Sequence, residues 1–172
     1  IVCEKMDIRM KSVFGCYRSM EKECGIVLLS VTPSYEETLV ESGPTSYLFR
    51  GVVGGSSPQL AYVRYASAEK QHPVLCVYQK GAKPQVALDF ERVFGNDLQI
   101  GCFSPCTRAP RVFVLLCGMD DKNAAGIWCF QLDKREATRV RTRDTEDVFA
   151  SPDGSRIACR DDDSTIEILS VP

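Results

Sequence analysis

The sequence predicts an all-β fold of short antiparallel strands in repeated four-stranded units. Three observations support this prediction. Apolar runs are only four to eight residues long, clusters of Gly, Pro, Ser and Asp separate them, and helical periodicity is nearly absent from the 172 residues. Turn signals recur every eight to twelve residues, which is typical of β-sandwiches, β-barrels and β-propellers.

The first half of the chain contains one candidate helix among its predicted strands. The segment 34–41 favours a short helix, because Ser34 is a suitable N-cap and acidic residues follow in the first turn. A polar strand connection is the alternative for the same segment. Strands are expected at 11–17, 26–31, 47–53, 59–65, 74–79 and 85–90.

The second half is predicted to be made entirely of strands. Residues 112–116 form an apolar run of strand length, and 165–169 alternate apolar and polar residues, as an outer strand with one packed face does. Strands are expected at 98–103, 111–117, 126–132, 137–143, 147–150, 156–160 and 165–171.

A longer repeat distinguishes among the possible β architectures. The stretch 102–132 aligns with 149–171, since each leads from an aromatic residue through Ser-Pro to an apolar strand, an acidic turn and a second strand; Pro105 corresponds to Pro152. Two weaker copies precede them, and the spacing of about 40 to 45 residues is that of a propeller blade. The repeat units are expected at 7–45, 46–90, 91–135 and 136–171.

The segment 149–171 reads FASPDGSRIACRDDDSTIEILSV. This order of a Ser-Pro-Asp-Gly turn, a strand, an Asp turn and a last strand resembles the tryptophan-aspartate (WD) repeat. The resemblance implies a β-propeller, or part of one, that binds partners through its loops and blade edges. The Trp-Asp pair of that family is missing here: Trp128 is followed by Cys129, and Leu169-Ser170 stands at the corresponding place in the last copy.

Composition bounds the domain and its surroundings. The 172 residues are expected to form a single all-β domain. Because Ile1 is not an initiator Met, we expect this domain to be an excerpt of a longer chain whose further blades complete it. A net charge of −2 and the absence of a long apolar run argue against nucleic-acid and membrane partners. Nine cysteines beside one histidine favour free buried thiols over a disulfide framework, and therefore the cytoplasm or the nucleus.

No motif predicts catalysis, a cofactor or a metal site, so an enzyme is not expected. Cys102 and Cys106 are not at zinc-knuckle spacing, and His72 has no partners for a catalytic triad. The glycine-rich loop 51–58 lacks the Gly-Lys-Ser of a phosphate-binding loop, and the acids at 161–163 lack the spacing of a calcium loop. Loops, hairpin turns and structural cysteines explain these features.

Arg139, Arg141 and Arg143 form the candidate binding site. They alternate along one predicted strand and would share a face, where guanidinium groups could receive an acidic or phosphorylated partner. The alternative is an exposed strand balanced by the acids that follow. We therefore expect a non-catalytic scaffold that binds a protein or peptide; an accessory substrate-recognition or regulatory β domain of a larger enzyme, like a polo-box peptide binder, is the second hypothesis.

Overall fold

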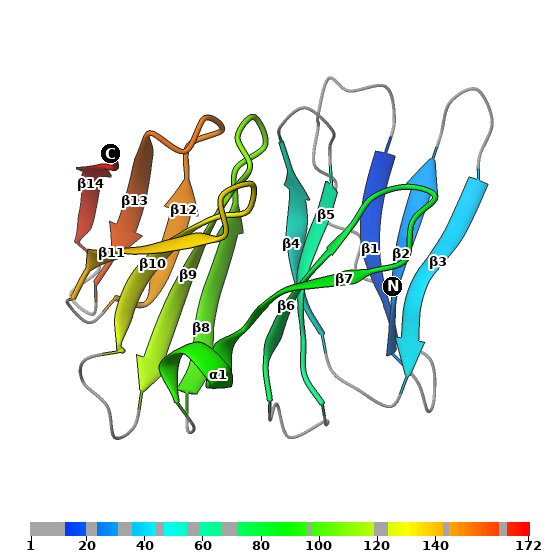
Figure 1. The fold of residues 1–172 in the computed structure, drawn as a ribbon. Helices are drawn as coiled ribbons and strands as arrows, with labels where there is room; N and C mark the ends of the chain where they lie inside the picture. The colour runs from blue at the N-terminus through cyan, green and yellow to red at the C-terminus, as the bar shows by residue number, and fades with distance from the viewer. Residues whose placement is uncertain are drawn as a thin grey trace.

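The computed structural model describes residues 13–19, 24–30, 36–43, 47–54, 59–66, 72–95, 98–118, 124–142, 145–161 and 165–172. Its strands form four antiparallel sheets that follow one another along the chain (Figure 1). The first sheet has strands β1 (Val13–Ser19), β2 (Cys24–Ser30) and β3 (Glu36–Gly43), and the second has β4 (Tyr47–Val53), β5 (Gln59–Arg64), β6 (Val74–Tyr78) and β7 (Gln85–Asp89). The third sheet has β8 (Leu98–Pro105), β9 (Arg111–Gly118), β10 (Gly126–Gln131) and β11 (Glu136–Arg141), and the fourth has β12 (Asp147–Ala150), β13 (Arg156–Arg160) and β14 (Ile166–Ser170).

Each sheet is an up-and-down meander in which strands that are neighbours in sequence pair with one another. Successive sheets meet through their first strands, since β1 contacts β4, β4 contacts β8, and β8 contacts β12. In Figure 1 the sheets lie in a row, with the first at the right and the fourth at the left. The prediction of an all-β chain of short antiparallel strands is therefore confirmed.

The inner strands of the third sheet, β9 and β10, are buried on both faces, and β9 shows how. Val112, Val114 and Leu116 pack toward the second sheet, whereas Phe113 and Leu115 pack in a separate core with the fourth sheet. Because side chains alternate between the faces of a strand, a sheet covered on both sides needs an unbroken apolar run. All five residues of the run at 112–116, which lies within β9, are accordingly buried.

One short helix, α1 (Phe90–Phe94), joins the second sheet to the third. Asp89 caps it by accepting the backbone N–H of Arg92, and Gly95 ends it at a φ of 88°. Phe94 packs edge-on against Trp128 of β10 with ring centroids 4.7 Å apart, and Phe90 contacts Phe130 in the same way. Aromatic packing therefore fixes the helix on the third sheet. The part of the chain that the structure describes holds no helix with the length and apolarity to cross a membrane.

Two sequence predictions need correction. The helix expected at 34–41 is wrong, because residues 36–43 form β3, which pairs with β2 along its length. The boundary expected at 135/136 does not match the sheets, since β11 pairs with β10 and is the outer strand of the third sheet. The helix α1 was not predicted from the sequence, because its five residues are too few to show helical periodicity.

Candidate functional site

The candidate arginines lie on and beyond β11. Arg139 and Arg141 line a hollow of about 440 Å³ between β11 and β14, together with Glu167. Arg143 lies outside the described residues. The hollow thus brings two of the predicted residues together at the boundary between the third and fourth sheets.

Both guanidinium groups in this hollow already have partners within the chain. Arg141 forms an ion pair of 2.9 Å with Glu167, and its side chain is only 8% exposed. Arg139 lies over the ring of Trp128 and donates to the carbonyl oxygen of Ala125. An irregularity in the pairing of β10 with β11 sets Arg139 opposite Trp128 and Arg141 opposite Ile127. An acidic ligand would therefore have to displace Glu167 from Arg141, and binding at this strand stays a prediction.

The cysteines of the second half are core residues with one exception. Cys102, Cys106, Cys129 and Cys159 all belong to the core between the third and fourth sheets, whereas Cys117 is exposed. Burial raises the pKa of the Cys106 thiol to about 12. Within the described ranges no three potential metal ligands come together. These thiols therefore act as small apolar side chains.

The histidine and the turn acids take part in local structure. His72 precedes β6 at a φ of 51°, and its Nδ1 lies 2.5 Å from Glu91 Oε2 of α1. Asp161 accepts the backbone N–H of Thr165 across the turn into β14. The paired acids at 120–121, residues 162–163 and the loop residues 55–58 lie outside the described part of the chain.

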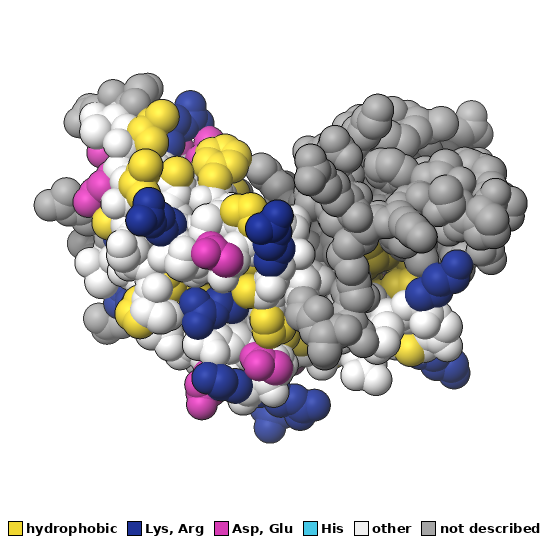
Figure 2. Space-filling view, turned by 90° about the horizontal axis from the view of Figure 1, so that it is seen from above, with side chains coloured by type: hydrophobic (Ala, Val, Ile, Leu, Met, Phe, Trp, Pro, Cys, Tyr) yellow, Lys and Arg dark blue, Asp and Glu magenta, His cyan; other side chains and the backbone are white. Residues whose placement is uncertain are grey.

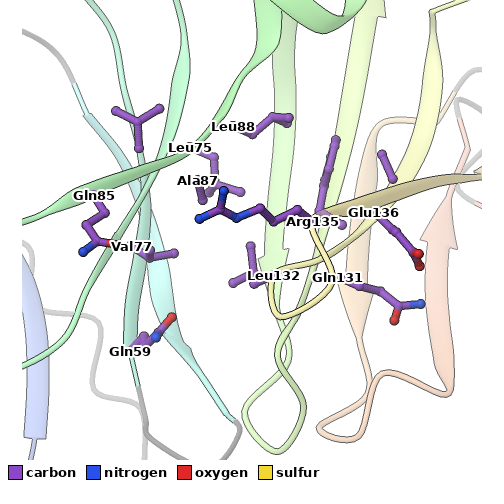
Figure 3. A pocket seen from close by; sticks show the side chains of 13 residues that line it. Gln59, Leu75, Val77, Gln85, Ala87, Leu88, Gln131, Leu132, Arg135 and Glu136 are labelled. Carbon is purple, nitrogen blue, oxygen red and sulfur yellow. The ribbon is translucent and has the colours of Figure 1, made fainter.

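A pocket of about 170 Å³ lies between the second and third sheets, and no sequence motif indicated it. Its apolar walls come from both sheets, and its polar groups are three glutamines, Arg135 and Glu136. Figure 3 shows its lining side chains. They are Gln59, Leu75, Val77, Gln85, Val86, Ala87, Leu88, Phe130, Gln131, Leu132, Arg135, Glu136 and Ala137.

Arg135 is the charged group that reaches across this pocket. It belongs to the turn between β10 and β11, and its side chain extends toward Leu75 and Ala87 of the neighbouring sheet (Figure 3). Glu136 points the other way in the same view. Among the described residues, no ion pair involves Arg135. The sequence shows a turn here, but it does not show that the turn lies over another sheet.

A partly buried polar cluster joins the first sheet to the second. Glu41 of β3 accepts hydrogen bonds from Tyr62, at 2.5 Å, and from Arg64. Burial, followed by the hydrogen bond to Glu41, raises the pKa of Tyr62 above its ordinary value. Because Tyr62 stays protonated and its hydroxyl and the Arg64 guanidinium share one carboxylate, we interpret this cluster as a clamp between sheets rather than as a reactive site.

The fourth sheet leaves one apolar face uncovered. Val148 and Ile157 point into the core shared with the third sheet, whereas Phe149, Ile166 and Ile168 are 54, 69 and 68% exposed. Figure 2 shows hydrophobic side chains at the surface on this side of the molecule, among Lys, Arg and acidic groups. Single apolar side chains are ordinary on a protein surface, whereas a contiguous row of them indicates an interaction surface.

Comparison with known proteins does not assign the chain to a family. No protein-family model matches the chain, and no curated protein sequence matches it.

Proposed function

We propose that the chain is a non-catalytic interaction scaffold, a WD-like propeller or part of one, that binds other proteins through its stacked sheets. The uncovered face of β12–β14 carries this proposal. Four meanders that follow one another and meet through their first strands are consistent with propeller blades.

The uncovered face is continuous across the whole sheet. Phe149 of β12 is paired with Ala158 of β13, and Ala158 is paired with Ile168 of β14. Since paired residues lie on the same side of a sheet, these three form a row, with Ile166 beside it. Arg160, opposite Ile166, is bound to Asp147 at 2.6 Å and to Glu146 at 2.9 Å. Arg160 thus engages both acidic side chains at this end of the row, and the apolar side chains of the row itself favour an apolar partner.

The partner that fits this face is a further antiparallel sheet of the same repeat type. The third sheet presents Phe113, Leu115 and Ile127 to the fourth, and the second sheet presents Val63 and Leu75 to the third. The outward face of the fourth sheet continues this series of stacked apolar faces. Sheets stack about 10 Å apart with interdigitating side chains, so a sheet with aliphatic residues on one face can cover the row.

Self-association of the purified chain tests the proposal, with the sheets of a second copy as the probe. Sedimentation velocity over a series of protein concentrations should show reversible association of the wild type. The double variant Phe149→Ser, Ile168→Thr should remain monomeric, because it makes the row polar at positions that are already exposed. Val93→Thr is the matched control, since Val93 is 53% exposed on α1, outside the row.

Two results would overturn this function. One is a wild-type chain that stays monomeric at every concentration. The other is a double variant that associates as strongly as the wild type, since association would then use a different surface.

A further inference from the structure

We propose that the pocket between the second and third sheets binds a carboxylate that is carried next to an aliphatic group. A peptide C-terminus with an aliphatic last residue has this chemistry, and so does an acidic side chain beside an aliphatic one. The pocket is separate from the uncovered face of the fourth sheet, and the two proposals are tested with different variants.

The size of the pocket selects the class of ligand. Its volume is about 170 Å³, whereas sites for cofactors and drug-sized molecules measure about 300 to 1,000 Å³. The space therefore suits one side chain or one chain end. Of the lining side chains, Leu75 and Phe130 are buried, and Val77, Leu88 and Leu132 are partly buried, so the interior favours an aliphatic group.

The charge at the pocket selects a carboxylate. Arg135 supplies the only positive charge among the lining residues, and Glu136 supplies the only negative one. In Figure 3 the Arg135 guanidinium extends over the apolar side chains, while Glu136 points away from it. A guanidinium group binds a carboxylate through two parallel hydrogen bonds. Gln59 and Gln85, which both come from the second sheet, add neutral donors and acceptors.

The backbone of Arg135 gives independent support. Its φ is 56°, and His72 is the only other described non-glycine residue with a positive φ. Gly or Asn is the ordinary residue in this left-handed conformation. An arginine there places a long cationic side chain at the last position of the β10–β11 turn, from which it reaches the neighbouring sheet. Strained residues of this kind are concentrated at binding sites.

Two small probes that differ in one group test the pocket. N-acetyl-leucine carries a carboxylate beside its aliphatic side chain, and N-acetyl-leucinamide is the same molecule with that charge removed. We expect the acid to shift the methyl NMR signals of Leu75, Leu88 and Leu132 with a dissociation constant on the order of 1 mM. The amide should bind about tenfold more weakly, because a charge-assisted hydrogen bond is lost.

Arg135→Gly is the informative variant. Glycine accepts a φ of 56°, so the turn should keep its fold while the guanidinium is removed. The acid should then bind as weakly as the amide. Lys134→Ala is the control, since Lys134 lies in the same turn but does not line the pocket. N-acetyl-Leu-Glu-amide distinguishes an acidic side chain from a C-terminus as the source of the carboxylate.

The proposal is overturned if the acid produces no shifts, if acid and amide bind equally, or if Arg135→Gly binds the acid as the wild type does. Unchanged methyl signals of Ile157, in the other core, would show that the variant is folded. Loss of self-association in the Phe149 and Ile168 variant would leave this site intact, so the two proposals can fail separately.

Discussion

Gly54 donates its backbone N–H to the carbonyl oxygen of Cys106 at 2.8 Å, which joins the end of β4 to the end of β8. A Cβ atom at Gly54 would lie 2.4 Å from the carbonyl oxygen of Thr107 and 2.5 Å from Arg108 Cα. Both are backbone atoms that cannot rotate away. The close approach of the second and third sheets at this end therefore requires glycine.

Gly54→Ala should lower the free energy of unfolding by about 1 to 3 kcal/mol, as overpacking does. Urea unfolding at neutral pH measures the loss of stability, and the backbone amide at position 54 should exchange its hydrogen faster in the variant than in the wild type. Gly81→Ala is the control, because an added Cβ at Gly81 meets no atom within 4 Å and only its φ of 85° is unfavourable. Unchanged stability and unchanged exchange in Gly54→Ala would contradict the close approach.

Strands were largely predictable from the sequence, because two-sided burial leaves a local signature. The run at 112–116 became β9, and β13 has the bounds 156–160 that were expected. Tertiary pairing explains the failure at 34–41, where an N-cap and acids suggested a helix but β2 provided a partner strand. The signals around α1, Asp89 before it and Gly95 after it, were present but enclosed only five residues.

The candidate site was harder to predict, since its residues become neighbours only when the sheets stack. Arg135 looked like one residue of an ordinary turn, and nothing local places it over Leu75, which lies 60 positions earlier in the numbering. The arginines of β11 were recognised as a pattern, yet a pairing irregularity opposite Trp128 and the ion pair with Glu167 depend on contacts that the sequence does not show.

Two buried thiols predict a loss of stability at high pH. Burial raises the pKa of Cys106 from 9.0 to about 12 and that of Cys76 from 9.0 to about 11. The folded state holds these protons more tightly than the unfolded state, so the stabilisation is complete below the ordinary pKa and is lost as the pH rises toward the folded values. Each thiol can lower the free energy of unfolding by up to about 1.4 kcal/mol for each pH unit in this range.

Urea unfolding between neutral pH and about pH 11 measures this dependence. Cys106→Ala should show a smaller alkaline slope than the wild type, whatever its stability at neutral pH. Cys117→Ala is the matched control, because Cys117 is exposed, and its slope should equal that of the wild type. Equal slopes in all three proteins would show that the Cys106 thiol does not titrate with folding.

The turn between β12 and β13 predicts a change at low pH. Asp153 accepts hydrogen bonds from the Ser151 hydroxyl at 2.7 Å and from the Ser155 backbone N–H at 3.1 Å. These bonds lower the pKa of Asp153 from 3.8 to about 2. A carboxyl group with a lowered pKa stabilises its turn at pH values above its ordinary pKa, and that stabilisation is lost as the pH falls toward 2.

The amide signal of Ser155 should therefore shift as the pH falls from about 4 to about 2. Asp153→Asn removes the titrating group and should abolish the shift. Asp133→Asn is the control, since Asp133 accepts a backbone N–H in a different turn, that of Lys134. A Ser155 signal that titrates unchanged in Asp153→Asn would assign the low-pH change to another group.

The ion pair between Arg141 and Glu167 predicts a measurable coupling between the outer strands of the third and fourth sheets. Its 2.9 Å contact joins a side chain that is 8% exposed to one that is 50% exposed. A double-mutant cycle with Arg141→Met and Glu167→Gln should give a coupling of about 0.5 to 1 kcal/mol, because one partner is still hydrated. The pair of Arg160 with Glu146, at 44 and 47% exposed, should couple less and lose its coupling in about 1 M salt. Equal coupling in the two pairs would mean that burial of Arg141 does not strengthen its ion pair with Glu167. The Arg141 guanidinium would then be able to exchange Glu167 for an acidic partner, as the sequence suggested.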